Sequence, residues 1–345
     1  MPKRRGISIK DVARESQASL TTVSLVLNNR DGRISPATRE RVLKTVDRLG
    51  YRPSRLAQGL QAQRSGCLAI LVRQLRHAFA DIYFGELISA IHDFASGAGY
   101  KILLEVAHPD FIQQRQHLEL FDRHFVDGLL ALGVTTNDDY LADFEDSHRA
   151  ALIVNNYLSG KRLNHVKCDY RLAGRMAGEY LLRLRHRDIG LIHGATEVQT
   201  SSDLRAGFEE TLLATGFPLP PERIADGLYT EEGGAAAAAT LLERAPDLTA
   251  IMAGNDKMAI GAISAIKESG RRVPEDVSVM GCDDLRGAEY CDPPLTTIHT
   301  PLYEVGQSAC QRLLELVDGK VERVEETFPV SLTVRKSTAP PTRAS

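Results

Sequence analysis

The sequence is poor in cysteine and has no cysteine pattern that would build a covalent or metal framework. Its 345 residues contain five cysteines, an odd number, and each stands alone in the chain. Without a CxxC pair or a Cys/His cluster at ligand spacing, neither a disulfide scaffold nor a zinc site is predicted. This usage is typical of proteins that remain in a reducing cytoplasm.

Long hydrophobic runs and the signatures of common enzymes are also missing. The longest apolar runs, such as LAILV, are far shorter than the roughly 20 residues that span a bilayer. The start MPKRRGISIK continues into polar residues rather than an apolar stretch, so we expect no signal peptide. The motifs GxxxxGK[ST], GxSxG and HExxH do not occur. We therefore predict no metal, no cofactor and no catalytic residues.

Charge is present in ordinary amount but is distributed unevenly. Residues 1–64 contain 14 Lys and Arg and 5 Asp and Glu, a net charge of +9, although the whole chain carries −3. Residues 65–345 therefore carry −12. A basic head on an acidic body is expected when only one end of a protein binds a polyanion. The alternative is a solvated basic face without a partner.

The basic segment has the signals of three short helices. Ser8 and Asp11 form a capping-box-like start for the first, Ser19 can cap the second, and Ser35-Pro36 starts the third. Only a few residues separate the first two helices. This spacing predicts a helix-turn-helix, whose second helix enters the major groove of DNA.

The second helix has an uncharged polar face. No acid or base occurs in residues 16–29, SQASLTTVSLVLNN. Helical spacing predicts that Val23, Val26 and Leu27 are buried. The other face then presents Leu20, Thr21, Thr22 and either Ser24 or Leu25. Short hydroxyls and methyls can approach base edges, while the surrounding Lys and Arg bind phosphates. The alternative is a small helical bundle whose Thr/Ser face is merely solvated.

A short linker follows in residues 51–66, YRPSRLAQGLQAQRSG. Pro53 favours an extended backbone at Arg52, and Ser54 can cap a helix over residues 55–63. A helix of this length is marginal alone. We expect this helix to become ordered only when another segment or molecule packs against it.

From Gly66 onward, short apolar runs alternate with helical stretches. The runs are CLAILV, KILLEV, DGLLALG, ALIVNN, DIGLIHG, AIMAGND and VSVMGCDD. This alternation predicts parallel sheets wrapped by helices, with enough length for two lobes. Ligands of such folds bind at the carboxyl ends of the strands or in a cleft between lobes.

Polar residues follow three of the predicted strands: Asp169, Asn255 and Asp283. A carboxylate accepts hydrogen bonds from ligand hydroxyls or amines. Tyr83 and Phe84 begin the first helix of the body and could stack on a ring. Each residue also has a structural alternative, because a polar residue after a strand often caps a helix and an aromatic residue often lies in the core.

Segments along the whole chain form a recognisable family pattern. The head contributes SIKDVARES, TTVSLVLNN, ISPATRERVL and LGYRPSRLAQGL, and the body contributes RHRDIGLIHG, AGND, RRVPEDVSVMGCDD and DPPLTTIHTP. To about Val334, the chain resembles the lactose-repressor (LacI/GalR) family of bacterial transcription regulators. The resemblance implies a body like periplasmic sugar-binding proteins and a homodimer on palindromic operator DNA. It also implies hinge helices that push a leucine into the minor groove.

The resemblance places base reading at Leu20, Thr21 and Leu25, and the minor-groove contact at Leu60 with Ala57 beside it. The full set of predicted DNA-binding residues is Ser19, Leu20, Thr21, Thr22, Ser24, Leu25, Asn28, Arg30, Tyr51, Arg52, Ser54, Arg55, Ala57 and Leu60. The predicted effector-binding residues are Tyr83, Phe84, Asp169, Thr200, Arg205, Tyr229, Asn255 and Asp283. Of these, Thr200 and Tyr229 are implied by the family register.

Several positions depart from the family pattern. Gln17 occupies a turn position where glycine is common. Leu25 replaces a frequent arginine or histidine, which weakens the case for a bidentate guanine contact. Asn155-Asn156 replaces a common pair that contains Asp. Leu204 stands where an arginine would clamp a ligand; either the adjacent Arg205 substitutes for it, or the pocket recognises something different.

We predict four parts: a helix-turn-helix DNA-binding domain (1–52), a hinge helix (53–64), a two-lobed effector-binding and dimerisation domain (65–334) and a flexible tail (335–345). The fold class is a small all-α head plus an α/β, periplasmic-binding-protein-like core with parallel sheets.

The predicted function is a sequence-specific transcriptional repressor whose operator affinity is controlled by a sugar or related metabolite. We expect it in the bacterial cytoplasm, nucleoid-associated when bound to DNA. The alternatives are a sugar-binding transport protein, which the basic head disfavours, and an α/β enzyme, which the lack of a catalytic constellation disfavours.

Overall fold

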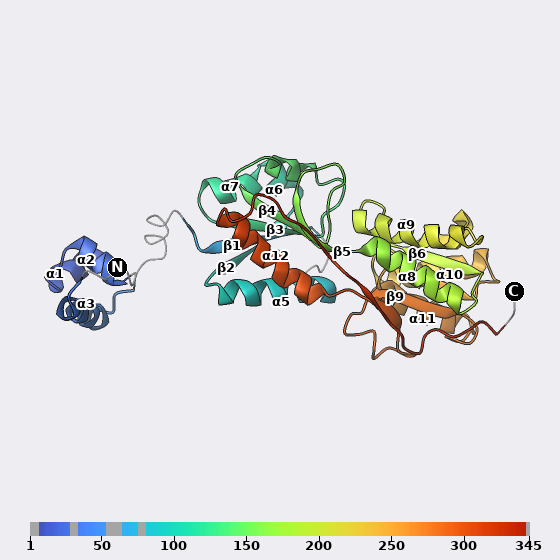
Figure 1. The fold of residues 1–345 in the computed structure, drawn as a ribbon. Helices are drawn as coiled ribbons and strands as arrows, with labels where there is room; N and C mark the ends of the chain where they lie inside the picture. The colour runs from blue at the N-terminus through green and yellow to red at the C-terminus, as the bar shows by residue number, and fades with distance from the viewer. Residues whose placement is uncertain (1–6, 28–33, 53–63, 75–80, 343–345) are drawn as a thin grey trace. The chain divides into compact units, whose positions relative to one another are not determined.

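The chain forms two compact units, residues 1–65 and 66–345, which are the head and the body (Figure 1). The structure is a computed structural model and describes residues 7–27, 34–52, 64–74 and 81–342. Among these residues, no helix is long and apolar enough to cross a membrane.

In its described residues, the head contains three helices: α1 (Ile9–Glu15), α2 (Leu20–Leu27) and α3 (Pro36–Leu49). The Asp11 carboxylate accepts a hydrogen bond from the Ser8 N–H at 3.0 Å, which fixes the start of α1. The hydroxyl oxygens of Ser19 and Ser35 each accept one from the backbone N–H three residues later, at 3.0 and 3.3 Å. The three predicted helix starts are therefore confirmed.

A small apolar core holds the three helices together. Val12, Val23, Val26 and Val42 are at most 1% exposed, and they come from all three helices. Full burial of a valine contributes about 1.5–3 kcal/mol. The predicted burial of Val23 and Val26 is therefore confirmed, whereas Leu27 is only partly buried, and the opposite face of α2 is left toward solvent.

The turn between α1 and α2 contains a strained residue. Gln17 has a φ of 52°, in the left-handed region that glycine adopts at little cost. We expect Gln17→Gly to raise the unfolding free energy of the head by about 0.5–1 kcal/mol. Gly50 has a φ of 62°, and a Cβ there would meet nothing within 4 Å. Gly50→Ala should therefore lower the unfolding free energy by a similar amount through backbone strain alone. Hydrogen exchange of the α2 and α3 amides measures both, and shifts of the same sign would contradict this account.

The first lobe of the body is a six-stranded parallel sheet in the order β11-β5-β4-β3-β1-β2. The strands are β1 (Cys67–Arg73), β2 (Lys101–Ala107), β3 (Gly128–Leu132), β4 (Ala150–Val154), β5 (Asn164–Cys168) and β11 (Glu325–Phe328). Helices α5 (Ile82–Gly97) and α12 (Leu302–Val317) pack on one face, and α6 (Pro109–Gln113) and α7 (Gln116–Asp122) pack on the other. The 3-10 helix η2 (Asp139–Phe144) follows β3. Because β1 is covered on both faces, its sequence is an unbroken apolar run.

The second lobe is a six-stranded sheet in the order β12-β10-β9-β8-β6-β7, in which only β12 runs antiparallel to its neighbour. The strands are β6 (Ile189–His193), β7 (Ile224–Asp226), β8 (Ala250–Ala253), β9 (Ser278–Asp283), β10 (Thr296–His299) and β12 (Ser331–Thr333). Helices α8 (Tyr170–Arg183) and α9 (Gln199–Ala214) cover one face, and α10 (Glu231–Arg244) and α11 (Asp256–Glu268) cover the other. The 3-10 helix η3 (Pro221–Arg223) precedes β7.

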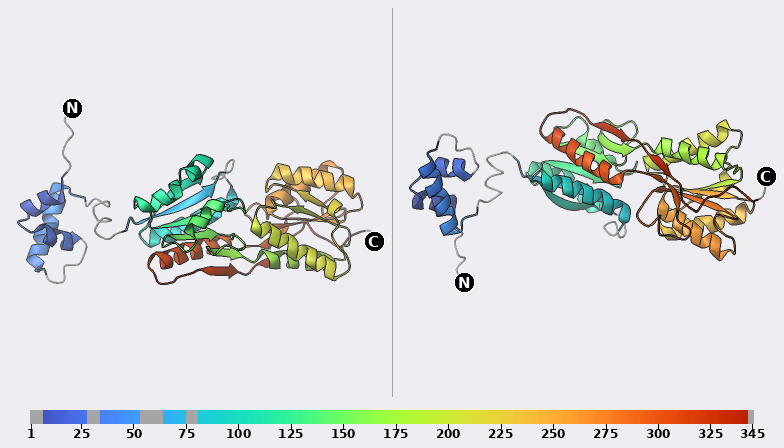
Figure 2. Two further views of the ribbon diagram at one scale, coloured as in Figure 1. Left: turned by 90° about the horizontal axis from the view of Figure 1, so that it is seen from above. Right: turned by 60° about the horizontal axis from the view of Figure 1, so that its bottom comes forward.

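Three connections join the two lobes: after β5, after β10 and after β11 (Figure 2). The sequence from α12 to β11 therefore belongs to the first lobe although it follows almost the whole of the second. This arrangement confirms the predicted parallel sheets and two lobes, and it turns the carboxyl ends of strands in both sheets toward the connections.

The carboxyl-terminal segment differs from the flexible tail predicted for residues 335–345. Ser337 is completely buried, and its hydroxyl donates to the Val279 carbonyl at 2.6 Å. The Ala339 N–H donates to the Ser278 hydroxyl oxygen at 3.0 Å. The segment has no apolar pattern, but it continues from β12 along the sheet and its polar groups find partners there. The prediction of flexibility is therefore wrong as far as residue 339.

Candidate functional site

The exposed face of α2 carries five of the predicted DNA contacts. Leu20 is 45% exposed and Thr21 is also exposed. The others on this face are half-buried: Thr22, Ser24 and Leu25. The Ser19 hydroxyl lies 2.8 Å from the Thr22 hydroxyl, so the capping residue adds to the same polar surface. Hydroxyls, methyls and a leucine side chain are groups that can contact base edges and the thymine methyl.

Of the remaining predicted DNA contacts, only Tyr51 and Arg52 lie within the described residues. The Tyr51 side chain packs against the apolar core of the head, whereas Arg52 is exposed. A partly buried ring packed on the core fits a structural role for Tyr51, and an exposed guanidinium fits a phosphate contact for Arg52. The other predicted contacts lie outside the described residues: Asn28, Arg30, Ser54, Arg55, Ala57 and Leu60.

In the body, a hydrogen-bonded chain of side chains runs from one lobe to the other. The Asn155 amide donates to the hydroxyl oxygens of Tyr83 and Tyr170, both at 2.9 Å. The Tyr170 hydroxyl in turn donates to Asp283 Oδ1 at 3.4 Å. Tyr83 belongs to α5 of the first lobe, and Asp283 ends β9 of the second. The structure thus brings two of the predicted effector residues together through two residues that were not predicted.

Asp283 is a buried carboxyl with only long side-chain contacts. It is 5% exposed, and besides Tyr170 its Oδ1 has the Thr300 hydroxyl at 3.5 Å. Burial raises the pKa of this carboxyl well above its ordinary value, and the nearby Asp256 raises it further. No cationic side chain in the described part of the chain forms an ion pair with Asp283. Such a group gains most from a ligand that donates hydrogen bonds, such as a hydroxyl or an amine.

Two further contacts join the lobes near this chain. Asp81, which caps α5, forms an ion pair with Lys257 of α11, and each side chain is 18% exposed. The Tyr157 hydroxyl donates to the Asp203 carboxylate at 2.9 Å. Together with the Asn155 chain they hold the carboxyl-end loops of the two sheets against each other.

Two of the predicted effector residues cap helices. Asp169 Oδ1 accepts a hydrogen bond from the Leu172 N–H at 2.9 Å and caps α8. Asn255 Oδ1 accepts one from the Met258 N–H at 2.9 Å and caps α11. Both side chains therefore act as helix caps, which is the structural alternative to effector binding. The cap does not use the side-chain amide nitrogen of Asn255.

The aromatic and hydroxyl residues of the prediction lie at different depths. Phe84 is 8% exposed and belongs to the apolar core of the first lobe, with its ring edge-on to Tyr83 at 5.3 Å. Thr200 is buried in the first turn of α9. Tyr229 has a φ of 60°, and its ring packs so closely on Gly194 that a Cβ there would lie 2.2 Å from it. Burial raises the pKa of Tyr229 above its ordinary value.

Arg205 is directed away from these residues. Its Nε donates to Glu209 at 2.8 Å, and its side chain lines a cavity of about 520 Å³ with His193, Asp226 and Arg244. None of the other predicted effector residues lines that cavity. Leu204, in the family's arginine position, is 3% exposed and lies in the core. The structure therefore does not bring Arg205 to Asp283 as a substitute for the missing arginine.

Sequence reasoning missed Asn155, Tyr170 and Lys257 as members of the site. Asn155 directly follows β4, and Tyr170 follows the residue after β5, so both stand at carboxyl ends of strands. The rule that selected Asp283 could have found them. Asn155 was noticed only as a departure from the family pattern; its φ of 51° is one that asparagine tolerates well.

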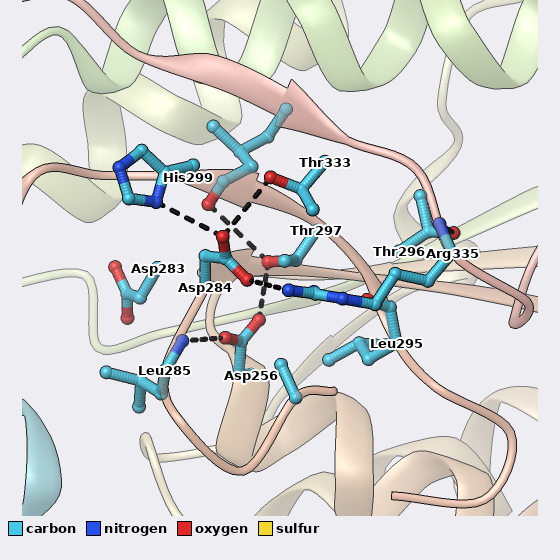
Figure 3. A network of polar contacts seen from close by, with 12 residues as sticks. Asp256, Asp283, Asp284, Leu285, Leu295, Thr296, Thr297, His299, Thr333 and Arg335 are labelled. Atoms are coloured by element: carbon cyan, nitrogen blue, oxygen red, sulfur yellow. Dashed lines mark hydrogen bonds and ion pairs between the residues drawn. The ribbon is translucent and has the colours of Figure 1, made fainter. Parts of the chain in front are cut away.

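A second polar network lies beside Asp283 (Figure 3). The Asp256 carboxylate accepts hydrogen bonds from the Leu285 N–H at 2.6 Å and from the Thr297 hydroxyl at 2.5 Å. Burial raises the pKa of Asp256 to about 7. Asp284 is bound to Arg335 at 2.6 Å. In the described ranges, no group of three or more His, Cys, Asp or Glu residues is placed to hold a metal ion.

Comparison with known proteins agrees with this geometry. Residues 8–54 match the family described as "Bacterial regulatory proteins, lacI family", and residues 179–338 match the "Periplasmic binding protein-like domain". The HTH-type transcriptional repressor PurR of Erwinia tasmaniensis is 33% identical over 336 residues, which cover 96% of this chain and 97% of that protein. The chain belongs to the lacI family of bacterial regulatory proteins. A PurR of Klebsiella pneumoniae is 32% identical over 342 residues, with the same coverage.

Solved structures of lacI-family regulators have the same fold. The Lac repressor dimer bound to operator and the anti-inducer ONPF matches with a TM-score of 0.86 and 27% identity, over 97% of this chain and 100% of that one. The complex of the transcriptional regulator CelR with cellobiose matches with a TM-score of 0.74 and 28% identity, over 96% and 99%. The family and fold predicted from the sequence are confirmed: a transcription regulator with a helix-turn-helix head and a two-lobed α/β body.

Proposed function

We propose that the protein is a homodimeric transcriptional repressor whose affinity for a palindromic operator is controlled by a small-molecule effector. The effector binds between the two lobes, where it contacts Asp283 and Tyr83. The body has no enzymatic role, and the protein acts in the bacterial cytoplasm on nucleoid DNA.

The observation that carries the proposal is the uncharged, exposed face of α2 on a head of net charge +9. The apolar half of α2 is buried in the head, so the Leu20 and Thr21 face is the surface left to read bases. The surrounding Lys and Arg supply phosphate contacts, which position the helix without reading sequence. The operator-bound Lac repressor dimer, which has the same fold, supports both the operator and the dimer.

The effector class follows from the cleft and from the relatives. Asp283 is a buried acceptor with no cationic partner in the described residues, so donor-rich molecules such as sugars suit it. One similar structure contains cellobiose, and another, a lacI-family regulator from Enterococcus faecium, contains ribose. We propose a sugar or a related hydroxyl-bearing metabolite.

Selection of a duplex from a random library, followed by a ligand screen, tests the proposed function. We expect the full chain to select a palindromic duplex. We expect at least one neutral sugar or polyol to raise the melting temperature of the protein and to change operator affinity by about 5–150-fold. Recovery of no preferred duplex would contradict the DNA-binding role. A ligand that stabilises the body but leaves operator affinity unchanged would contradict the regulatory role.

A further inference from the structure

The turn that follows β9 is held in an unfavourable backbone conformation. Asp283 has a φ of 112° and Asp284 has a φ of 59°, both in the left-handed region. Non-glycine residues there cost about 1–3 kcal/mol each and persist only when their surroundings hold them. Two such residues in succession, the first of which carries the candidate ligand-binding carboxyl, require a specific restraint.

The Asp284 side chain supplies the restraint on one side of the turn (Figure 3). Its Oδ1 accepts from Arg335 Nη2 at 2.6 Å. Its Oδ2 lies 3.1 Å from His299 Nδ1 and accepts from the Thr333 hydroxyl at 3.2 Å. Three side chains from β10, β12 and the carboxyl-terminal segment therefore bind this one carboxylate.

Arg335 is itself fixed by the strand beside it. Its Nη1 donates to the Leu295 carbonyl at 2.9 Å, and its backbone N–H donates to the Thr296 hydroxyl oxygen at 2.9 Å. The Arg335 side chain is 20% exposed. Because a guanidinium presents donors in fixed directions, it binds the strand and Asp284 at once, which a lysine ammonium cannot reproduce.

The Asp283 carboxyl has only weak contacts of its own. Its own side-chain contacts, to Tyr170 and Thr300, are 3.4 and 3.5 Å long and carry no opposite charge. On the far side of the turn, Asp256 binds the Leu285 N–H at 2.6 Å. The Thr300 N–H donates to the Asp283 carbonyl at 3.4 Å, so the backbone is held at Asp283 and at the two residues after it, while the carboxyl itself is held loosely.

We propose that Arg335, acting through Asp284, is a positioning residue that directs the Asp283 carboxyl toward the Tyr170–Asn155–Tyr83 chain between the lobes. The carboxyl-terminal segment is then part of the effector site and not a tail. This inference rests on the proposed role of Asp283 in effector binding. It requires that removal of the Arg335 guanidinium releases the turn at Asp283 and Asp284.

Arg335→Gln in the full-length protein tests the restraint without DNA or ligand. We expect hydrogen exchange of the Leu285 amide to become at least about tenfold faster, while the Leu191 amide, in β6 of the same sheet, keeps its rate. We expect the Asp283 carboxyl, followed by ¹³C NMR and assigned with Asp283→Asn, to titrate closer to an ordinary aspartate as it swings toward water. Loss of the Arg335 charge alone would raise the pKa of nearby carboxyls, so a fall in the Asp283 pKa reports release of the turn.

Two further variants complete the test. Arg335→Lys keeps the charge near Asp284 but loses the Leu295 contact, so we expect intermediate exchange and titration. Arg323→Gln removes an exposed arginine that pairs with Glu325, and we expect no change in either readout. Equal effects of Arg335→Gln and Arg335→Lys, or an unchanged Asp283 titration in Arg335→Gln, would overturn the inference.

The outcome is separable from that of the proposed function. Neither readout requires an operator or an effector, so a failed ligand screen leaves the test of Arg335 intact. Conversely, an unchanged turn in Arg335→Gln would refute the positioning role while the repressor proposal stands. When a ligand from the screen is in hand, Arg335→Gln should weaken its binding about tenfold, with no added loss in an Asp283→Asn background.

Discussion

Gly207→Ala should destabilise the second lobe by about 3 kcal/mol or more, although alanine is the better helix former. A Cβ at Gly207 of α9 would lie 2.0 Å from the Arg171 carbonyl oxygen of α8. The contact is reciprocal, because a Cβ at Gly174 of α8 would lie 1.9 Å from the Leu204 carbonyl oxygen of α9. Backbone atoms cannot turn aside as side chains do, so the two helices must separate. Since α8 and α9 carry Tyr170 and Thr200, their close packing also places the cleft residues.

Thermal unfolding of the full-length protein measures this effect. For the body, residues 66–345, 3 kcal/mol corresponds to a fall in the melting temperature of roughly 5 °C. Gly97→Ala in α5 is the matched control, because a Cβ there meets nothing within 4 Å. It should raise stability by up to about 1 kcal/mol. A melting temperature for Gly207→Ala equal to or above that of the unmodified protein would show that the α8–α9 packing is not as described.

Thr21→Glu should weaken operator binding by about 100-fold or more. Thr21 is exposed on α2, and the helix carries no charge that could compensate a carboxylate there. A negative charge facing base edges and phosphates costs several kcal/mol, and each 1.4 kcal/mol is a factor of ten in affinity. The fold should survive, because the side chain points to solvent.

Fluorescence anisotropy with the selected palindromic duplex measures this loss. Gln17→Glu is the matched control: it adds the same charge to the same head, in the exposed turn before α2 and outside the helix itself. We expect it to weaken binding only a few-fold, by reducing the overall attraction to phosphate. Equal losses for the two variants would mean that the head binds through net charge alone and that α2 reads no bases.

The head could be predicted almost completely from the sequence because its signals are local. A serine before each of α2 and α3, and a glycine after α3, act within one helical turn and mark the boundaries directly. The buried face of α2 follows from helical spacing. Gln17 has a left-handed backbone without being glycine, so its sequence gives no local signal of the turn. Only the family resemblance, in which glycine is common at this position, pointed to it.

The lobes could be predicted from alternation, but the membership of the cleft could not. Strand ends give a rule for Asp283 and, applied evenly, for Asn155. The rule does not say whether such a residue faces the cleft or caps the next helix, as Asp169 does, because both roles use the same position. The contact of Lys257 with the first lobe could not be predicted from the sequence, since its partner Asp81 lies 176 residues earlier in the chain.

The placements of Arg205 and of the carboxyl-terminal segment differ from expectation because side-chain direction and long-range pairing are not local properties. Arg205 is adjacent to Leu204, but one residue along a helix turns a side chain by about 100°, which places it on another face. The carboxyl-terminal segment lacks apolar periodicity, yet Ser337 and Arg335 bind a sheet edge formed by distant strands. Polar anchoring of this kind leaves no hydrophobic pattern to detect.

The dependence of operator affinity on salt tests the central claim most directly. For the full-length protein on its selected palindrome, we predict that the logarithm of affinity falls against the logarithm of salt concentration with a slope of about −5 or steeper, as expected when several phosphates are neutralised. A chain that begins at Gly66 should show no specific binding at any salt concentration. A slope near zero for the full-length protein, or equally tight binding by the chain without its head, would contradict the account.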